Sequence, residues 1–124
     1  GFNNFKWNYT KFPTPKTMID HLHQQGIRVI AWATSLVNND SSNYQEGKEK
    51  GYFLNKGGLV KWWHGHGAFI DYRNKEAVDW WHRQMDEVLD IGLDGWKTDG
   101  SDPIIHLLKP WPYSQKKTHI VTYR

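Results

Sequence analysis

The 124-residue chain is long enough for one domain with its own core, and its apolar content of 38% is ordinary. Eight Trp, six Tyr and five Phe make the aromatic share 15%, and such rings pack cores or stack on the apolar faces of sugars. The net charge is +3 and no long run of basic residues is present, which argues against nucleic-acid binding. The chain has no apolar stretch of about 18 residues, as a membrane-spanning helix would need, and no Cys, so it cannot form disulfides.

The first predicted elements are a helix and a strand. Thr14 is a typical N-cap residue, Pro15 fits the first helical position, and Gly26 is a typical C-terminal stop. The apolar run 27–33 follows at once and predicts a mostly buried strand. A helix, one glycine and a strand are typical of an α/β protein.

The next segment is less regular. Ser42 followed by Gln45 is a capping-box pattern and predicts a short helix. The apolar runs 52–54 and 59–63 flank a glycine-containing turn and predict a small hairpin, which the glycines of 65–67 end. This segment is therefore predicted to be a long loop excursion between the first strand and the next long helix.

The clearest helix follows a short extended segment, 68–71. Asn74 is its predicted cap and Gly92 its predicted end. One face is apolar at helical spacing: Val78, Trp81, Met85, Val88 and Leu89. Residues 93–98 then predict a second strand.

This order of elements predicts an α/β fold with a parallel βαβ unit. A complete (β/α)8 TIM barrel needs about 250 residues. We therefore expect the chain to form about half of a barrel with a long βα loop excursion, as a fragment, residues 1–124, of one catalytic domain. The absence of an initiating Met agrees with a start inside a longer protein.

The candidate chemistry lies at the carboxyl end of the second strand, where parallel α/β folds gather catalytic side chains. Lys97 and Asp99 are two apart and share a face, so the cation favours an ionised carboxylate suited to a nucleophile. A structural ion pair or helix cap is an equal alternative. Asp102 is either a second functional carboxylate or, with Pro103, the start of a turn.

Other polar residues suggest less specific roles. Asp71 could hold its loop by accepting backbone hydrogen bonds. His64 and His66 would lie on one side of an extended segment, but no third ligand has supporting spacing, so we predict no metal site and no cofactor. Trp62 or Trp63 could form a wall on which a sugar stacks.

Five segments in order resemble glycoside hydrolase family 31, which includes α-glucosidases and α-xylosidases. They are Phe12-Pro13-Thr14-Pro15-Lys16, Leu22-His23-Gln24-Gln25-Gly26-Ile27-Arg28-Val29, the stretch 42–52, Phe69-Ile70-Asp71-Tyr72-Arg73-Asn74, and Leu93-Asp94-Gly95-Trp96-Lys97-Thr98-Asp99-Gly100. The resemblance runs from about Phe5 to Pro103.

The resemblance implies a retaining α-glycosidase barrel acting on an α-linked carbohydrate. Asp99 would be the nucleophile that forms a covalent glycosyl-enzyme, and Lys97 would contact a substrate hydroxyl. Trp32, with Trp62 or Trp63, would line the sugar subsite. The family's acid/base aspartate lies on a later strand, so the 124-residue chain alone is expected to be inactive.

Two departures from the family pattern concern the sugar pocket. Thr34-Ser35 replaces an Asn-Pro pair, and Gly100-Ser101-Asp102 replaces Phe-Gly-Glu or Met-Asn-Glu. A galactose-type or other non-glucose specificity would fit them.

Two alternatives to a catalytic fragment stay open. One is a non-catalytic carbohydrate-binding module using Trp32, Trp62 and Trp63. The other is a ligand-free structural fragment, whose open sheet edges would favour self-association of the incomplete barrel.

Overall fold

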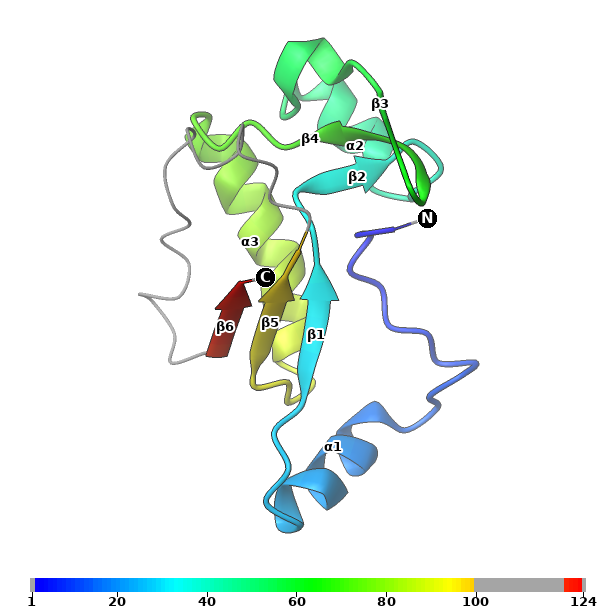
Figure 1. Cartoon of the computed structure of the whole chain (residues 1–124), viewed down its shortest axis with the longest axis vertical. Helices are drawn as coiled ribbons and strands as arrows, with labels where there is room; N and C mark the ends of the chain where they lie inside the picture. The colour runs from blue at the N-terminus through cyan, green and yellow to red at the C-terminus, as the bar shows by residue number, and fades with distance from the viewer. Residues whose placement is uncertain (1, 100–119, 124) are drawn as a thin grey trace.

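The computed structural model describes residues 2–99 and 120–123. Its centre is a parallel sheet of β1 (Ile30–Ala33), β5 (Gly95–Thr98) and β6 (Ile120–Tyr123), in the order β1-β5-β6. Helix α3 (Lys75–Leu89) lies behind these strands in Figure 1 and precedes β5 in the chain. Strand, crossover helix and parallel strand form the predicted βαβ unit, so the α/β prediction is confirmed.

The first helix, α1 (Pro15–Gln24), matches the prediction, with Pro15 in its first turn. The strand after it begins at Ile30 and not at residue 27. Val29 pairs instead with Asp94: its N–H donates to the carboxylate and its carbonyl accepts from the Asp94 N–H. Ala33 is the one buried residue of this strand and Ile30 is 39% exposed, so the prediction of a mostly buried strand is wrong.

Between β1 and α3 the chain leaves the parallel sheet and forms a separate lobe, drawn above it in Figure 1. We call residues 34–74 the excursion. It contains β2 (Leu36–Asn38), α2 (Tyr44–Glu49), the 3-10 turn η1 (Leu54–Gly57), β3 (Val60–Trp62) and β4 (Gly65–Phe69). The three strands form an antiparallel sheet in the order β2-β4-β3.

The predicted capping box is wrong, although the short helix exists. Helix α2 has Asn43 at its N-cap position, with no side-chain capping bond, and Gln45 donates to Glu49 instead. The bonds of the Asn43 amide nitrogen orient this side chain toward other segments of the chain, and its oxygen accepts no hydrogen bond from the first turn of the helix.

The predicted hairpin is also wrong. Residues 52–54 do not pair with 59–63, because residues 54–57 coil into η1, where Asn55 and Lys56 have positive φ. Instead β3 pairs with β4, and the glycines of 65–67 lie inside a strand and do not end one. Gly65 closes the turn with a φ of +111°, a conformation that favours glycine.

Helix α3 confirms the strongest periodicity in the sequence. The Asn74 side chain accepts from the N–H groups of Glu76 and Ala77 as a true N-cap. Trp81 is fully buried in the core, while Trp80, 3% exposed, packs against rings of the excursion. The helix therefore joins the two sheets. No helix among the described residues is long and apolar enough to cross a membrane.

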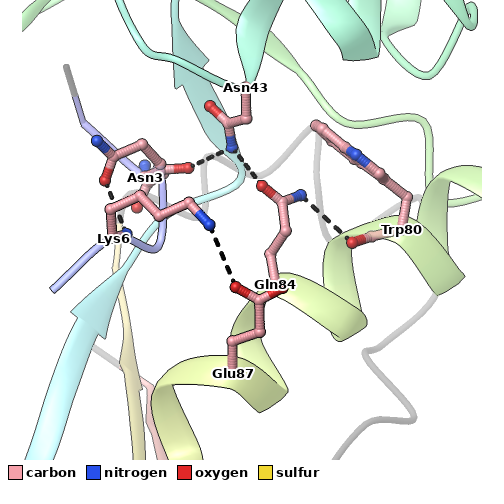
Figure 2. Close-up of polar contacts among 7 residues, drawn as sticks. Asn3, Lys6, Asn43, Trp80, Gln84 and Glu87 are labelled. Carbon is pink, nitrogen blue, oxygen red and sulfur yellow. Dashed lines mark hydrogen bonds and ion pairs between the residues drawn. The ribbon is translucent and has the colours of Figure 1, made fainter.

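A polar network ties the N-terminal segment to both the excursion and α3 (Figure 2). The Asn43 amide nitrogen donates to the Asn3 carbonyl oxygen at 2.9 Å and to the Gln84 side-chain oxygen at 2.8 Å. Lys6 forms an ion pair with Glu87 at 3.2 Å. These contacts fix residues 2–6 beside the carboxyl end of β1.

Candidate active site

Asp99 follows β5 at the carboxyl end of the parallel sheet. Its backbone N–H donates to the Ala33 carbonyl oxygen at 2.9 Å, so the pairing of β1 with β5 extends to this residue. The Asp99 side chain keeps 27% of its surface exposed. It is therefore held firmly by its backbone yet reachable from solvent, at the end of the sheet where barrel enzymes place catalytic groups.

Two side chains donate to the same oxygen of this carboxylate. Lys97 Nζ lies 2.6 Å from Asp99 Oδ2, and Trp32 Nε1 lies 3.0 Å from it. Trp32 pairs with Lys97 across the two strands, so all three side chains lie on one face of the sheet. Both donors stabilise the carboxylate anion, the lysine through a charge-assisted bond. Lys97 and Asp99 thus lie together on one face as predicted, and Trp32 is a further hydrogen-bond donor to the same carboxylate.

Trp32, which donates to Asp99, is one of five rings that pack together, and we call them the aromatic cluster: Phe2, Trp32, Trp62, Trp63 and His64. Trp32 and Trp62 are parallel, with their centroids 6.3 Å apart and an interplanar angle of 6°. Trp63 is nearly perpendicular to Trp32 and 74% exposed. The cluster brings together Trp62 and Trp63, one of which was expected to form a sugar-stacking wall, and Trp32, which the family resemblance placed at the sugar subsite.

The β3–β4 hairpin carries most of this cluster, because Trp62 ends β3 and Trp63 and His64 form the turn. Asn38 of β2 binds this hairpin, because its side-chain oxygen accepts a hydrogen bond from Trp62 Nε1 at 2.8 Å. Phe2 covers the cluster from the N-terminal segment, 3.8 Å from the His64 ring. Sequence reasoning missed Asn38 and Phe2, since no local pattern marks residues whose partners are set by hairpin register.

His64 and His66 separate in the structure. His64 contacts Phe2 and Trp63 at ring-centroid distances of 3.8 and 3.6 Å, whereas His66 lies in β4 opposite Lys61. Within residues 2–99 no three His, Cys, Asp or Glu side chains gather into a possible metal site. Imidazole packing against aromatic rings accounts for His64.

Asp71 acts on its own loop. Its carboxylate accepts from the backbone N–H of Arg73 at 3.0 Å and from the Arg73 guanidinium at 2.9 and 3.0 Å. The side-chain bond to Arg73 lowers the pKa of Asp71. This geometry agrees with the loop-holding interpretation. Asp102, the other carboxylate considered, lies outside the described residues.

A second carboxylate is held at the opposite end of β5. Asp94, with 11% of its side chain exposed, accepts from His23 Nε2 at 2.8 Å, from the Val29 N–H at 2.7 Å and from Arg28 Nη1 at 2.8 Å. Burial raises the pKa of Asp94, but these hydrogen bonds outweigh it and lower the pKa to about 2. This ion-pair group links α1, β1 and β5.

Comparison with known proteins agrees with this arrangement. The sequence model described as the glycosyl hydrolases family 31 TIM-barrel domain matches residues 1–123. The α-xylosidase XylQ of Lactiplantibacillus pentosus is 32% identical over 103 residues, which cover 80% of this chain and 14% of that protein. The myogenesis-regulating glycosidase of Mus musculus is 34% identical over 89 residues, 68% of this chain and 12% of that protein.

Solved structures give the same result. A family 31 sulfoquinovosidase from E. rectale, in complex with an aza-sugar inhibitor, matches with a TM-score of 0.68 and 31% identity over 77% of this chain and 15% of that chain. An α-xylosidase from a soil metagenome, complexed with xylose, matches with a TM-score of 0.70 and 25% identity over 83% of this chain and 16% of that chain. The chain therefore spans a small part, about one seventh, of the proteins it resembles.

Proposed function

Because the chain belongs to glycoside hydrolase family 31, we propose that it is part of the catalytic (β/α)8 barrel of a retaining α-glycosidase, with residues 1–124 a fragment of that single domain. The observation that carries this proposal is the Asp99 carboxylate, which receives Lys97 and Trp32 on one oxygen at the carboxyl end of β5. An anion held in place next to an open ring surface is what a glycosidase nucleophile requires.

In the proposed reaction the Asp99 carboxylate attacks the anomeric carbon of an α-linked sugar. The glycosidic bond breaks, and the leaving oxygen takes a proton from the acid/base group. That group then removes a proton from water, the water oxygen attacks the anomeric carbon, and the ester bond to Asp99 breaks. The sugar leaves with its original configuration, and both carboxyl groups return to their starting states.

The other site residues have binding roles in this proposal. Lys97 donates to a sugar hydroxyl as well as to Asp99, and Trp32 keeps the carboxylate oriented. Trp62 and Trp63 offer ring faces to the substrate, and Trp63 is the most exposed of the three tryptophans. Asp102 would be a further substrate contact in the turn after the nucleophile.

We propose that the acid/base carboxylate is supplied outside residues 1–124, on a later barrel strand. Two carboxyl groups about 5–5.5 Å apart are needed in a retaining enzyme. The described parallel sheet has three strands, whereas a closed barrel of this type has about eight. The isolated chain is then inactive, and the outer edges of β1 and β6, which pair with no other described strand, favour association with the rest of the barrel or with a second copy.

For the sugar, we propose a galactose-type or other non-glucose glycone. Thr34, which stands where many family members have Asn, is 3% exposed directly after β1. Its neighbour Ala33 binds the Asp99 N–H through its carbonyl oxygen. A change at this position therefore alters the surroundings of the nucleophile.

The proposal is tested by trapping the covalent intermediate in the complete-barrel protein. Fluorinated glycosyl fluorides slow the second step, so a labelled enzyme accumulates and its peptides can be sequenced by mass spectrometry. We expect the label on Asp99. A label on another carboxylate, in an enzyme that the reagent inactivates, would refute the assignment.

A carbohydrate-binding module is the second candidate, favoured by the exposure of Trp63 beside Trp32 and Trp62. Such a module binds sugars through these rings without bond cleavage. The unmutated complete protein separates the two functions: hydrolysis of an aryl α-glycoside supports the enzyme, and binding by calorimetry without hydrolysis supports the module.

A further inference from the structure

Asn38 is a buried amide whose hydrogen bonds converge on the hairpin of the aromatic cluster. It is 4% exposed and lies at the end of β2. Its side-chain oxygen accepts from Trp62 Nε1 at 2.8 Å, and its side-chain nitrogen donates to the His64 carbonyl oxygen at 2.8 Å. One side chain therefore binds the last residue of β3 and the turn that follows.

One glycine of the hairpin, Gly67, makes room for this amide. A Cβ added at Gly67, which pairs with Asn38 across β2 and β4, would lie 2.9 Å from the Val37 carbonyl oxygen and 3.3 Å from Asn38 Oδ1. A Cβ at Gly65 would lie 3.6 Å from Asn38 Nδ2, an ordinary contact distance, so glycine is favoured there by its positive φ. Gly67, one of the glycines that the sequence suggested would end a hairpin, instead lets β4 approach the Asn38 side chain.

Contacts lead from Asn38 to the proposed nucleophile. Trp62, held by Asn38, lies parallel to Trp32, and Trp32 donates to Asp99 Oδ2 at 3.0 Å. The indole of Trp32 is packed against Trp62 on one side and meets Phe2 edge-on at 6.4 Å. The orientation of the Trp32 N–H therefore depends on where Trp62 is fixed.

Resting on the proposed glycosidase function, we propose that Asn38 is a positioning residue for the reaction: it fixes Trp62 against Trp32 and thereby directs the Trp32 N–H at Asp99. The Asn38 side chain bonds the Trp62 indole and the His64 carbonyl oxygen, and its link to Asp99 runs through Trp62 and Trp32. Its effect is transmitted through two indoles, each of which reports on its own hydrogen bond.

The test uses Asn38→Leu, which keeps a side chain of similar size without donor or acceptor. In the complete-barrel protein we expect kcat/KM to fall about tenfold, the effect of one misplaced hydrogen bond. The ¹H–¹⁵N resonances of both the Trp62 and the Trp32 indole N–H groups should shift. Trp62→Phe removes the same hydrogen bond from the other side and should shift the Trp32 resonance even if Asn38→Leu fails to fold.

Double variants separate positioning from general destabilisation. If Asn38 acts through Trp62, then Asn38→Leu combined with Trp62→Phe lowers kcat/KM no further than Trp62→Phe alone. The matched control is Tyr44→Phe, which removes another buried hydrogen bond of the excursion, the one from the Tyr44 hydroxyl to the Gly57 carbonyl oxygen. It should leave kcat/KM within about twofold and the Trp32 resonance in place below its unfolding temperature.

Failure of this proposal differs from failure of the proposed function. An unchanged Trp32 resonance in Asn38→Leu, or multiplicative losses in the double variant, would overturn the role of Asn38 in an active enzyme. If the complete protein cleaves no glycoside but Asn38→Leu still moves the Trp32 resonance, the positioning contacts stand and the glycosidase function is wrong.

Discussion

Two aspartates at opposite ends of β5 show how the same side chain serves different purposes. Asp94, at the amino end, is 11% exposed and is saturated by His23, Arg28 and the Val29 N–H. Asp99, at the carboxyl end, is 27% exposed and lies beside the aromatic cluster. A carboxylate enclosed by the chain's own donors stabilises the fold, whereas one open to a ring-lined surface is available for chemistry.

The largest expected effect is the loss of activity in Asp99→Asn. Without a nucleophilic carboxylate, kcat of the complete-barrel protein should fall by about 10⁴-fold or more, while its unfolding temperature changes little. Initial rates with an aryl α-glycoside and thermal unfolding measure the two quantities. Asp94→Asn is the control at the other end of β5. A comparable fall in its kcat would contradict the assignment of catalysis to Asp99 and of fold stabilisation to Asp94.

Removal of Asp94 should act on stability. Asp94→Ala leaves the Val29 N–H and two basic side chains without their acceptor, so the free energy of unfolding should fall by about 2 kcal/mol. Chemical denaturation measures this. Asp20→Ala, which breaks the exposed ion pair with Lys16, is the control and should change stability by less than about 0.5 kcal/mol. Equal losses in the two variants would contradict a special role for Asp94.

The same carboxylate predicts a pH dependence. The pKa of Asp94 is lowered to about 2 in the folded chain, from about 3.9 in an unfolded one. The contribution of the Asp94 carboxylate to the free energy of unfolding is therefore nearly complete above pH 4. About 1–2 kcal/mol of it is lost as the pH falls toward 2. Denaturation between pH 5 and pH 2.5 should show a shallower decline for Asp94→Asn than for the unmutated chain. Parallel curves would mean that another carboxylate dominates.

Loss of the Trp32 N–H is expected to have a smaller effect on the rate. Trp32→Phe keeps a ring beside Trp62 but removes the donor to Asp99, so kcat/KM should fall about tenfold. Trp7→Phe removes an indole N–H that bonds only the Phe12 carbonyl among the described contacts, and it should leave the rate unchanged. A similar loss in both variants would indicate general damage.

The smallest effect should come from the exposed ring. Trp63 is 74% exposed, so Trp63→Ala removes little packing and should lower the unfolding temperature only slightly. If it stacks on substrate, KM rises severalfold with kcat nearly constant, the pattern of lost uniform binding. Steady-state kinetics check this, and an unchanged KM would remove Trp63 from the site.

The elements predicted correctly from the sequence are those set by residues a few positions apart in the chain. The Asn74 cap and the apolar face of α3, the Pro15 start of α1, and the shared face of Lys97 and Asp99 all follow from short spacings. They were enough to place the candidate nucleophile at a strand end.

The hairpin and its register required information that the sequence does not carry locally. Strand β4 chooses β2 and β3 as partners through contacts such as Asn38 beside Gly67, which are distant in the chain. Asn43 matches a helix cap by type but is used between segments. For the same reason, neither the place of Phe2 in the aromatic cluster nor the bond from Trp62 to Asn38 could be predicted before the fold was known.

Chemical rescue of Asp99→Gly in the complete-barrel protein is the sharpest test of Asp99 as the nucleophile. With the nucleophile removed, azide can enter the vacated space and attack the anomeric carbon of an α-glycoside carrying a good leaving group. If Asp99 is the nucleophile, azide restores turnover and the product is the β-glycosyl azide, from a single inversion. An α-glycosyl azide, or no rescue in a folded variant that still binds sugar, would contradict the assignment of Asp99 as the nucleophile.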